Sequence, residues 1–229
     1  MIGIISAMES EIALLRDAMT NRQEQMRAGV IYYTGKIEGV DVTLLSCGVG
    51  KVNAAMHTQI LIDDYAPDVI LQSGVAGALS PKVNLYDVVI GNELCYHDMQ
   101  DFVLDSFTPL ERSYFADPAL VDLAANAAKD AIIGKIATGD QFIADLDAKK
   151  AIWEKTHALC TEMEGAAVAH TAYLNEIPFV TIRVISDHAD AAPEVTFAVF
   201  EKTAAKKSAE IVLRMLPNIT RAIAKRKEV

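Results

Sequence analysis

Acidic side chains mark two predicted strand ends in the last third of the chain. Glu162 and Glu164 lie where a short strand meets a helix, and Asp187 follows a strand predicted over residues 179–185. In open α/β sheets, ligands bind outside the carboxyl ends of the strands. Carboxyl groups placed there can transfer protons or bind hydroxyl groups. A solvated loop acid is the alternative for each one taken singly, so the prediction depends on the three occurring together.

The residues around these acids predict the elements that position them. Residues 179–185 form a β-branched, nearly continuous apolar run, which is typical of a strand covered on both faces. Small residues at positions 165–172 would let the preceding helix pack closely on a sheet, and residues 175–178 break that helix.

Strand and helix patterns alternate along the rest of the chain. Strands are predicted over residues 1–6, 30–33, 40–46, 68–72, 86–90, 93–98 and 133–138. Helices are predicted over residues 8–19, 51–65, 118–130, 147–156 and 194–225, with Pro217 interrupting the last. Residues 99–117 read as a loop that belongs to an interface or a lid. The alternation predicts one α/β domain over residues 1–229, with a largely parallel sheet.

Composition limits the classes of partner. The chain has 229 residues, of which 52% are hydrophobic, and a net charge of −10, which disfavours a nucleic-acid partner. We expect no membrane partner, because no apolar run is long enough to span a bilayer, and the amino terminus does not resemble a secretory signal. Cys47, Cys95 and Cys160 read as reduced, mostly buried residues of a cytoplasmic protein.

Two glycine motifs fall short of known phosphate-binding patterns. Residues 48–51 (GVGK) would need glycine in place of Leu45, and serine or threonine in place of Val52, to form a phosphate loop. Gly74 and Gly77 are a fragment of a dinucleotide fingerprint at most. We interpret both motifs as tight strand-to-helix turns beside a ligand.

The sequence indicates neither a metal site built on histidine nor the catalytic serine of a hydrolase. The pairs His97-Asp98 and His188/Asp190 lack a convincing set of metal ligands and read as solvated loop residues, so no metal site is predicted. The chain has no G-x-S-x-G elbow, which argues against a serine hydrolase.

Six short segments together resemble a known family. They are residues 2–11 (IGIISAMESE), 48–52 (GVGKV), 74–77 (GVAG), 139–143 (GDQFI), 162–164 (EME) and 183–187 (RVISD). By their number, order and spacing, the chain resembles the 5′-methylthioadenosine/S-adenosylhomocysteine nucleosidases of the purine nucleoside phosphorylase/hydrolase superfamily. The match covers nearly the whole chain.

The resemblance implies hydrolysis of the N-glycosidic bond between adenine and a 5′-thio-substituted ribose. Glu11 matches the family's water-activating carboxylate, and Asp187 matches the acid that protonates adenine at N7. The other residues of the matching site are Met8, Val49, Val75, Phe142, Ile143, Glu162, Met163, Glu164, Arg183, Ser186 and Phe197. 5′-Deoxyadenosine and aminodeoxyfutalosine are further candidate substrates. No metal or organic cofactor is implied.

The matched residues divide among the parts of the substrate. Glu164 and Met163 match ribose contacts, with Glu164 on the hydroxyl groups. Phe142 matches the aromatic ring that stacks on adenine, and the backbone of Ile143 reads the edge of the base. The apolar pocket for the 5′-alkylthio group is matched by Met8, Val49 and Phe197.

The resemblance also implies a fold and an assembly. The fold is α/β, a three-layer α/β/α sandwich with a central twisted mixed sheet. The family is typically a homodimer in which a neighbouring subunit helps to close the pocket. Residues 99–111 do not match the usual family segment, so Phe102, Val103 and Phe107 are only candidates for that part of the pocket.

A second departure from the family lies at Val75, where many relatives carry a serine that helps to hold the attacking water. Arg183 remains. Two alternative functions stay open from the residues. One is a purine nucleoside phosphorylase on the same fold, and the other is a non-catalytic nucleoside-binding protein.

Overall fold

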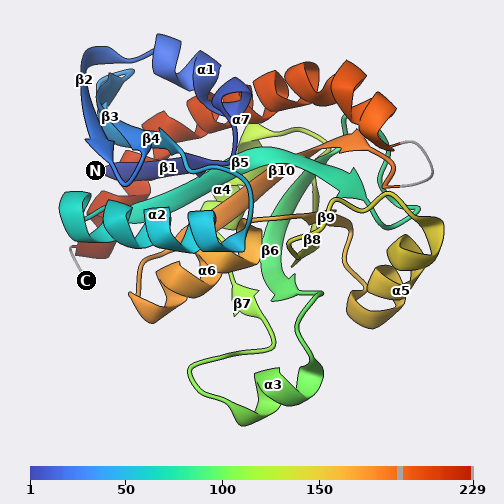
Figure 1. Cartoon of the computed structure of the whole chain (residues 1–229). Coiled ribbons are helices and arrows are strands. Elements are labelled where there is room, and N and C mark those ends of the chain that lie inside the picture. The colour runs from blue at the N-terminus through green and yellow to red at the C-terminus, as the bar shows by residue number, and fades with distance from the viewer. Residues whose placement is uncertain (190–192, 228–229) are drawn as a thin grey trace.

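One mixed sheet lies at the centre of the computed structural model, which describes residues 1–189 and 193–227 (Figure 1). The strands are β1 (Ile2–Ser6), β2 (Thr20–Arg27), β3 (Val30–Ile37), β4 (Val40–Ser46), β5 (Val69–Ala78), β6 (Val88–Tyr96), β7 (Tyr114–Phe115), β8 (Ile132–Thr138), β9 (Cys160–Glu162) and β10 (Phe179–Asp187). The helices are α1 (Glu9–Asp17), α2 (Lys51–Tyr65), α3 (Asp101–Ser106), α4 (Pro118–Ala127), α5 (Leu146–Thr156), α6 (Gly165–Leu174) and α7 (Pro193–Lys227).

The strand order brings remote segments of the chain together. Beginning at one end, the order is β10-β6-β8-β9-β5-β1-β4-β3-β2, and β10 also pairs with β5. The strands β5, β10, β6, β8 and β9 therefore close into a ring of paired strands. Parallel pairings such as β1 with β5 occur beside antiparallel ones such as β10 with β6, so the sheet is mixed rather than largely parallel.

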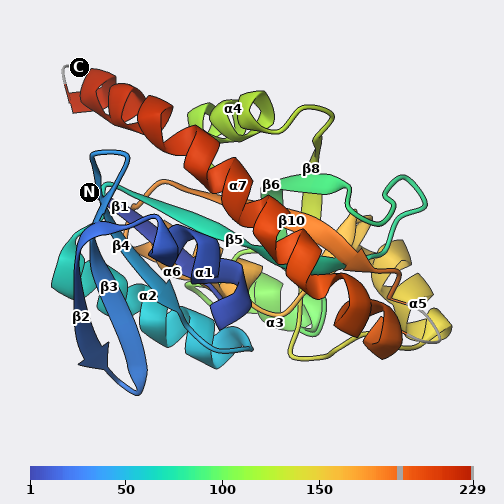
Figure 2. The same cartoon turned by 90° about the horizontal axis from the view of Figure 1, so that it is seen from above.

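Helices cover both faces of the sheet, which confirms the predicted α/β class (Figure 2). On one side α7 packs on β5 and β10, and α1 and α4 pack against α7. On the other side α6 packs on the sheet and α2 packs on α6. Residues 165–169 of α6 are all buried, because glycine, alanine and valine let this helix approach the strands closely.

The two central strands have the burial that their sequences predict. Every residue of β5 and β10 is buried. Residues 179–185 of β10 form the apolar run noted above, and it lies between α6 and α7. These two strands run parallel, so their carboxyl ends reach the same edge of the sheet.

Two sequence predictions were wrong in the outer parts of the fold. The strand β2 was missed because its polar residues are exposed at every position, so no alternation marks a buried face; it lies at one edge of the sheet. Residues 99–117, predicted as a loop, contain α3 and the short strand β7, which pairs with β6.

Two predicted interruptions are not present. The helix α7 continues through Pro217, whose ring lies on an exposed face and costs the helix a single backbone hydrogen bond. The two strands predicted over residues 86–90 and 93–98 form one strand, β6. Across the described ranges 1–189 and 193–227, no helix is long and apolar enough to cross a membrane.

Candidate active site

A cavity of about 410 Å³ lies at the carboxyl ends of β5 and β10. All thirteen residues that the resemblance assigned to the site line it, whereas Phe102, Val103 and Phe107, the candidates for a neighbour's part of the pocket, do not. The lining residues are Ala7, Met8, Glu11, Val49, Val75, Ala76, Gly77, Gln141, Phe142, Ile143, Thr161, Glu162, Met163, Glu164, Arg183, Ser186, Asp187, Ala189 and Phe197. Glu11, Glu164 and Asp187 therefore share one cavity, although they come from α1, the start of α6 and the end of β10.

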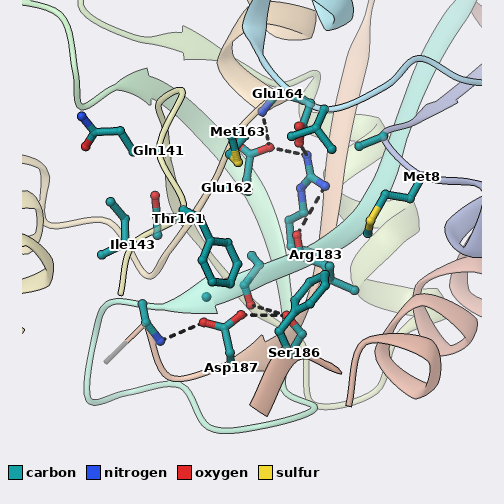
Figure 3. A pocket seen from close by; sticks show the side chains of 18 of the residues that line it. Met8, Gln141, Ile143, Thr161, Glu162, Met163, Glu164, Arg183, Ser186 and Asp187 are labelled. Carbon is teal, nitrogen blue, oxygen red and sulfur yellow. Dashed lines mark hydrogen bonds and ion pairs between the residues drawn. The ribbon is translucent and has the colours of Figure 1, made fainter. Parts of the chain in front are cut away.

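Figure 3 shows how the labelled side chains are arranged. Glu162, Met163 and Glu164 lie together near Arg183, while Asp187 and Ser186 lie at the other end of the view. The cavity thus has two separate acidic regions. One contains a buried cation and the other contains an aspartate beside a serine hydroxyl.

Glu11 is buried in the first turn of α1 and is held by three backbone N–H groups. Ala7 and Met8 donate to its Oε2 atom at 2.9 Å each, and Val75 donates to Oε1 at 3.0 Å. Burial raises the pKa of Glu11, although nearby Arg183 and these N–H groups act to lower it. A carboxyl group held this way can act as a general base toward a water molecule in the cavity.

Arg183 is the buried cation of the site, with 1% of its surface exposed. Its Nη2 atom pairs with Glu162 Oε2 and lies 3.8 Å from Glu164 Oε2. Burial works to lower the pKa of Arg183, but Glu162, Glu164 and Glu11 outweigh it and raise that pKa. One guanidinium therefore balances several carboxyl groups that burial would otherwise destabilise.

Glu162 binds the backbone at the start of α6 as well as pairing with Arg183. The N–H groups of Glu164 and Gly165 donate to its Oε2 atom at 3.0 and 2.7 Å, and Thr138 Oγ1 donates to Oε1. An anion at the amino terminus of α6 suits the helix dipole. Glu162 therefore fixes the turn that presents Glu164 to the cavity.

Glu164 has a protonation equilibrium that lies near neutral pH. Burial and the neighbouring Glu162 raise its pKa to about 7, against the opposing effects of Arg183 and a hydrogen bond from Gly50 N–H at 2.8 Å. Near neutral pH the side chain therefore exchanges between a proton donor and a carboxylate that accepts hydrogen bonds.

We expect Glu164 to make the fold less stable as the pH rises. Its pKa in the folded protein, about 7, exceeds the ordinary value of 4.5, so the folded state holds a proton that the unfolded chain releases. The contribution is fully present below pH 4.5 and is lost as the pH rises through 7. Glu164→Gln, which mimics the protonated group, should raise the free energy of unfolding at pH 8 by on the order of 2 kcal/mol.

Urea unfolding at pH 5 and pH 8 measures this effect. Glu154→Gln, the same change on an exposed face of α5, is the matched control and should change stability little at either pH. A Glu164→Gln protein that is less stable than the parent at pH 8 would contradict the raised pKa.

Asp187 lies at the end of β10, where the pairing with β5 shifts its register. It is 3% exposed; Ser186 Oγ donates to its Oδ2 atom at 2.9 Å, and Ala189 N–H donates to Oδ1 at 2.8 Å. These bonds hold the carboxyl group against the cavity with a defined orientation. A carboxyl group held this way can exchange a proton with a ligand in the cavity.

Gly74 and Gly77 were predicted to form a tight turn before a helix, and that prediction was wrong. Both lie within β5. A Cβ atom at Gly74 would overlap the Arg183 guanidinium and lie 2.5 Å from Glu11 Oε1, and one at Gly77 would lie 2.7 Å from Asp187 Oδ1. The glycines are required because side chains from other elements cross the strand at these points.

Apolar side chains form the remaining wall of the cavity. Phe142 and Phe197 meet edge to face, with ring centroids 5.7 Å apart. Met8 and Val49 also line the cavity, and Val49 is 49% exposed. This wall can therefore contact an aromatic ring or an apolar substituent of a ligand.

The match to a family model decides the relationship. The model described as Phosphorylase superfamily matches residues 1–217. The chain belongs to the phosphorylase superfamily. Within it, the chain belongs to the 5′-methylthioadenosine/S-adenosylhomocysteine nucleosidases, as the following relatives show.

Similar proteins in this superfamily have related names. The chain is 42% identical over 224 residues to the 5′-methylthioadenosine/S-adenosylhomocysteine nucleosidase of Geobacillus thermodenitrificans, covering 93% of this chain and 95% of that one. The structure of the Streptococcus pneumoniae nucleosidase with the transition-state inhibitor MT-ImmA is 34% identical, with a TM-score of 0.88 over 94% of this chain and 97% of that one. Futalosine hydrolase of Helicobacter pylori is 27% identical, with a TM-score of 0.89 over 95% and 97%.

Sequence reasoning missed several lining residues of this nucleosidase-family site. Ala7, Ala76, Gln141, Thr161 and Ala189 line the cavity without having been predicted. Each lies within two positions of a residue that the resemblance did identify, and this proximity along the chain is the signal that could have found them. Their types carry no signal of their own, because four of the five are alanine or threonine.

The histidines of this superfamily member are not simple solvated loop residues. His97 is 8% exposed, and its ring lies against Gly139, where a Cβ atom would overlap it. His188 is half-buried, and Asp190 lies outside the described residues. Within residues 1–189 and 193–227, no group of His, Cys, Asp or Glu could hold a metal ion.

Proposed function

We propose that this chain hydrolyses the N-glycosidic bond of 5′-methylthioadenosine and S-adenosylhomocysteine, releasing adenine and the thioribose product. The observation that carries the proposal is the meeting of Glu11, Glu164 and Asp187 in one cavity beside a buried arginine. Membership of the nucleosidase family supports the same reaction.

We assign to Asp187 the protonation that lets adenine depart. Adenine is a poor leaving group as an anion, and a proton delivered at N7 lets it leave neutral. Such general acid catalysis is worth about 10²–10⁴-fold in rate. The ring of Phe142 and the backbone of Ile143 line the same cavity and can stack on the base and bind its edge.

The sugar becomes positively charged as the bond breaks. Glu164, with its pKa of about 7, supplies a carboxylate near neutral pH that can accept hydrogen bonds from the ribose hydroxyl groups. The buried carboxyl groups of Glu162 and Glu11 add negative potential in a region shielded from water. A positive centre is stabilised more strongly in such a preorganised site than in water.

Glu11 activates the water that attacks the sugar. Its raised pKa makes it a better proton acceptor than an exposed glutamate. Val75 replaces the serine of many relatives, but its backbone N–H still donates to Glu11 Oε1 at 3.0 Å. Valine at this position therefore removes a hydroxyl group from the cavity, but the general base Glu11 keeps its hydrogen bond from the backbone.

A nucleoside phosphorylase is the alternative reaction, and the charges of the cavity disfavour it. A phosphate ion would approach Glu11, Glu162 and Glu164, while the guanidinium of Arg183 is already paired. We expect adenine release from 5′-methylthioadenosine to proceed at the same rate with and without phosphate. Strict dependence on phosphate would overturn the hydrolase assignment, and no release under either condition would support a nucleoside-binding protein.

A panel of adenine nucleosides tests the substrate. The panel contains 5′-methylthioadenosine, S-adenosylhomocysteine, 5′-deoxyadenosine and aminodeoxyfutalosine, with free adenine as the readout. The apolar wall of Met8, Val49 and Phe197 suits a 5′-alkylthio group, so we expect the highest kcat/KM for the first two. A clear preference for aminodeoxyfutalosine would instead move the substrate toward that of the futalosine hydrolase.

We also infer that the chain works as a homodimer. Large apolar side chains are exposed on α2, on and directly after α3, and in β7: Val52, Met56, Phe102, Phe107 and Phe115 are between 40% and 76% exposed. Exposed apolar surface of this kind can mark a protein–protein contact, and a second copy of the chain packed over these elements would cover it. Phe102 and Phe107 meet edge to face at 6.0 Å and are candidates to complete the neighbour's pocket.

The cysteines support a reducing, cytoplasmic location for the enzyme. Cys47, Cys95 and Cys160 are free and buried. Burial raises the pKa of each thiol, which keeps them as unreactive thiols.

A further inference from the structure

An ion-paired network joins three separate elements just outside the cavity. Lys51 opens α2, Asp98 follows β6, and Asp140 follows β8. Lys51 Nζ lies 2.6 Å from Asp98 Oδ2 and 3.7 Å from Asp140 Oδ2. The backbone N–H of Asp140 donates to Asp98 Oδ2 at 3.0 Å. The network is therefore closed on itself by both side-chain and backbone contacts.

Asp140 also caps α2. Gly50 precedes the helix and has no side chain with which to bind the free N–H groups of the first turn. Asp140 Oδ1 accepts the N–H of Lys51 at 2.8 Å, and it lies 3.2 Å from where a Cβ atom of Gly50 would stand. A carboxylate from a remote loop thus fixes the start of the helix and packs against Gly50.

The same glycine connects the network to the cavity. Gly50 N–H donates to Glu164 Oε1 at 2.8 Å, and Gly50 has a φ of +100°, a conformation that favours glycine. Since Gly50 is the residue before Lys51, the direction of its N–H bond depends on where Asp140 holds the helix start. We propose that Lys51, Asp98 and Asp140 are positioning residues that hold the Gly50 N–H group on Glu164.

The charges within the network suit this role. Burial works to raise the pKa of Asp98, but the hydrogen bonds from Lys51 and from Asp140 N–H outweigh it and lower that pKa. Asp98 is therefore ionised at neutral pH and keeps Lys51 paired. The Asp140 carboxylate at the amino terminus of α2 also suits the dipole of that helix.

The consequence for Glu164 is a lower pKa than burial alone would produce. The ionisable groups that act on it are Glu162 from β9, Glu11 from α1 and Arg183 from β10, and the thiol of Cys47 after β4 is also close enough to interact. Glu162 and Glu11 raise the pKa, while Arg183 and the Gly50 N–H lower it. If the Gly50 N–H no longer donates to Glu164, one of the two effects that lower the pKa of Glu164 is lost. A larger fraction of Glu164 is then protonated at neutral pH.

Asp140→Ala tests the network, and Asp140→Asn is the conservative variant, because its amide oxygen can still accept the Lys51 N–H. Asp117→Ala is the matched control: Asp117 caps α4 through Leu120 N–H at 3.0 Å and does not line the cavity. Carboxyl ¹³C NMR of Glu164 in each ligand-free protein should show its titration moved to higher pH in Asp140→Ala, restored in Asp140→Asn and unchanged in Asp117→Ala.

Kinetics supply the second readout, which rests on the proposed contact of Glu164 with the ribose hydroxyl groups. In Asp140→Ala we expect kcat/KM for 5′-methylthioadenosine to fall about tenfold, as for a lost hydrogen bond to a charged group. The acidic limb of the pH profile of kcat/KM should move to higher pH in this variant. The preference for this substrate over its 3′-deoxy analogue should shrink, whereas Asp117→Ala keeps both the rate and the preference.

The two readouts separate the two proposals. An unchanged Glu164 titration in Asp140→Ala, or the same shift in Asp117→Ala, would overturn the positioning network whatever the activity. A shifted titration in a protein whose parent form releases no adenine would support the network and overturn the proposed reaction instead.

Discussion

Replacing Asp187 with asparagine lowers kcat for adenine release by about 10²–10⁴-fold, the range that general acid catalysis supplies, and leaves the fold intact. The amide has the size of the carboxyl group; its oxygen can accept the Ala189 N–H bond, and its NH2 group can donate to Ser186 Oγ in place of the bond that the carboxylate accepted. It cannot deliver a proton to N7. Adenine must then leave as an anion, which is the difficult step that the acid avoids.

The measurement is single-turnover adenine release from 5′-methylthioadenosine, with circular dichroism to confirm folding. Asp122→Asn, the same change on an exposed position of α4, is the control and should keep the parent rate. A normal rate in Asp187→Asn would show that another group protonates the base.

Replacing Arg183 with methionine lowers the free energy of unfolding at pH 8 by about 3–5 kcal/mol, as for the removal of one partner from a buried ion pair. The side chain is 1% exposed and balances Glu162, Glu164 and Glu11. Methionine fills much of the volume but leaves these carboxyl groups without a cation. The loss should be smaller at pH 5, because Glu11 and Glu164, with their raised pKa values, can take up protons there.

Urea unfolding at the two pH values measures this loss. Arg214→Met, at an exposed position of α7, should change stability by no more than about 0.5 kcal/mol. If Arg183→Met were as stable as the control at pH 8, the balance of charge in the cavity would have to come from elsewhere.

Local patterns were sufficient for the main elements of the fold. The apolar run of residues 179–185 predicted the buried strand β10, and the small residues of 165–172 predicted a closely packed α6. Side chains covered on both faces must be apolar or small, so their pattern is visible along the chain. The exposed strand β2 has no such requirement, and for that reason its sequence did not predict it.

The order of short motifs was enough to name thirteen of the nineteen residues that line the cavity, but their contacts came from the tertiary structure. Glycine at position 74 is required because Arg183 and Glu11, from two other elements, occupy the space of its side chain. No turn pattern within residues 74–77 indicates this. The roles proposed for Glu11, Glu164 and Asp187 stay predictions until the variants are measured.

By itself, the sequence determined which family the chain resembles, which strands and helices are buried, and which side chains are available for chemistry. Only the tertiary structure decided the pKa of Glu164 and the link from Asp140 through Gly50 to that residue. Burial, charge pairing and hydrogen bonds depend on distances between residues that are remote along the chain. Periodicity and composition carry no information about those distances, because they describe only neighbours in sequence.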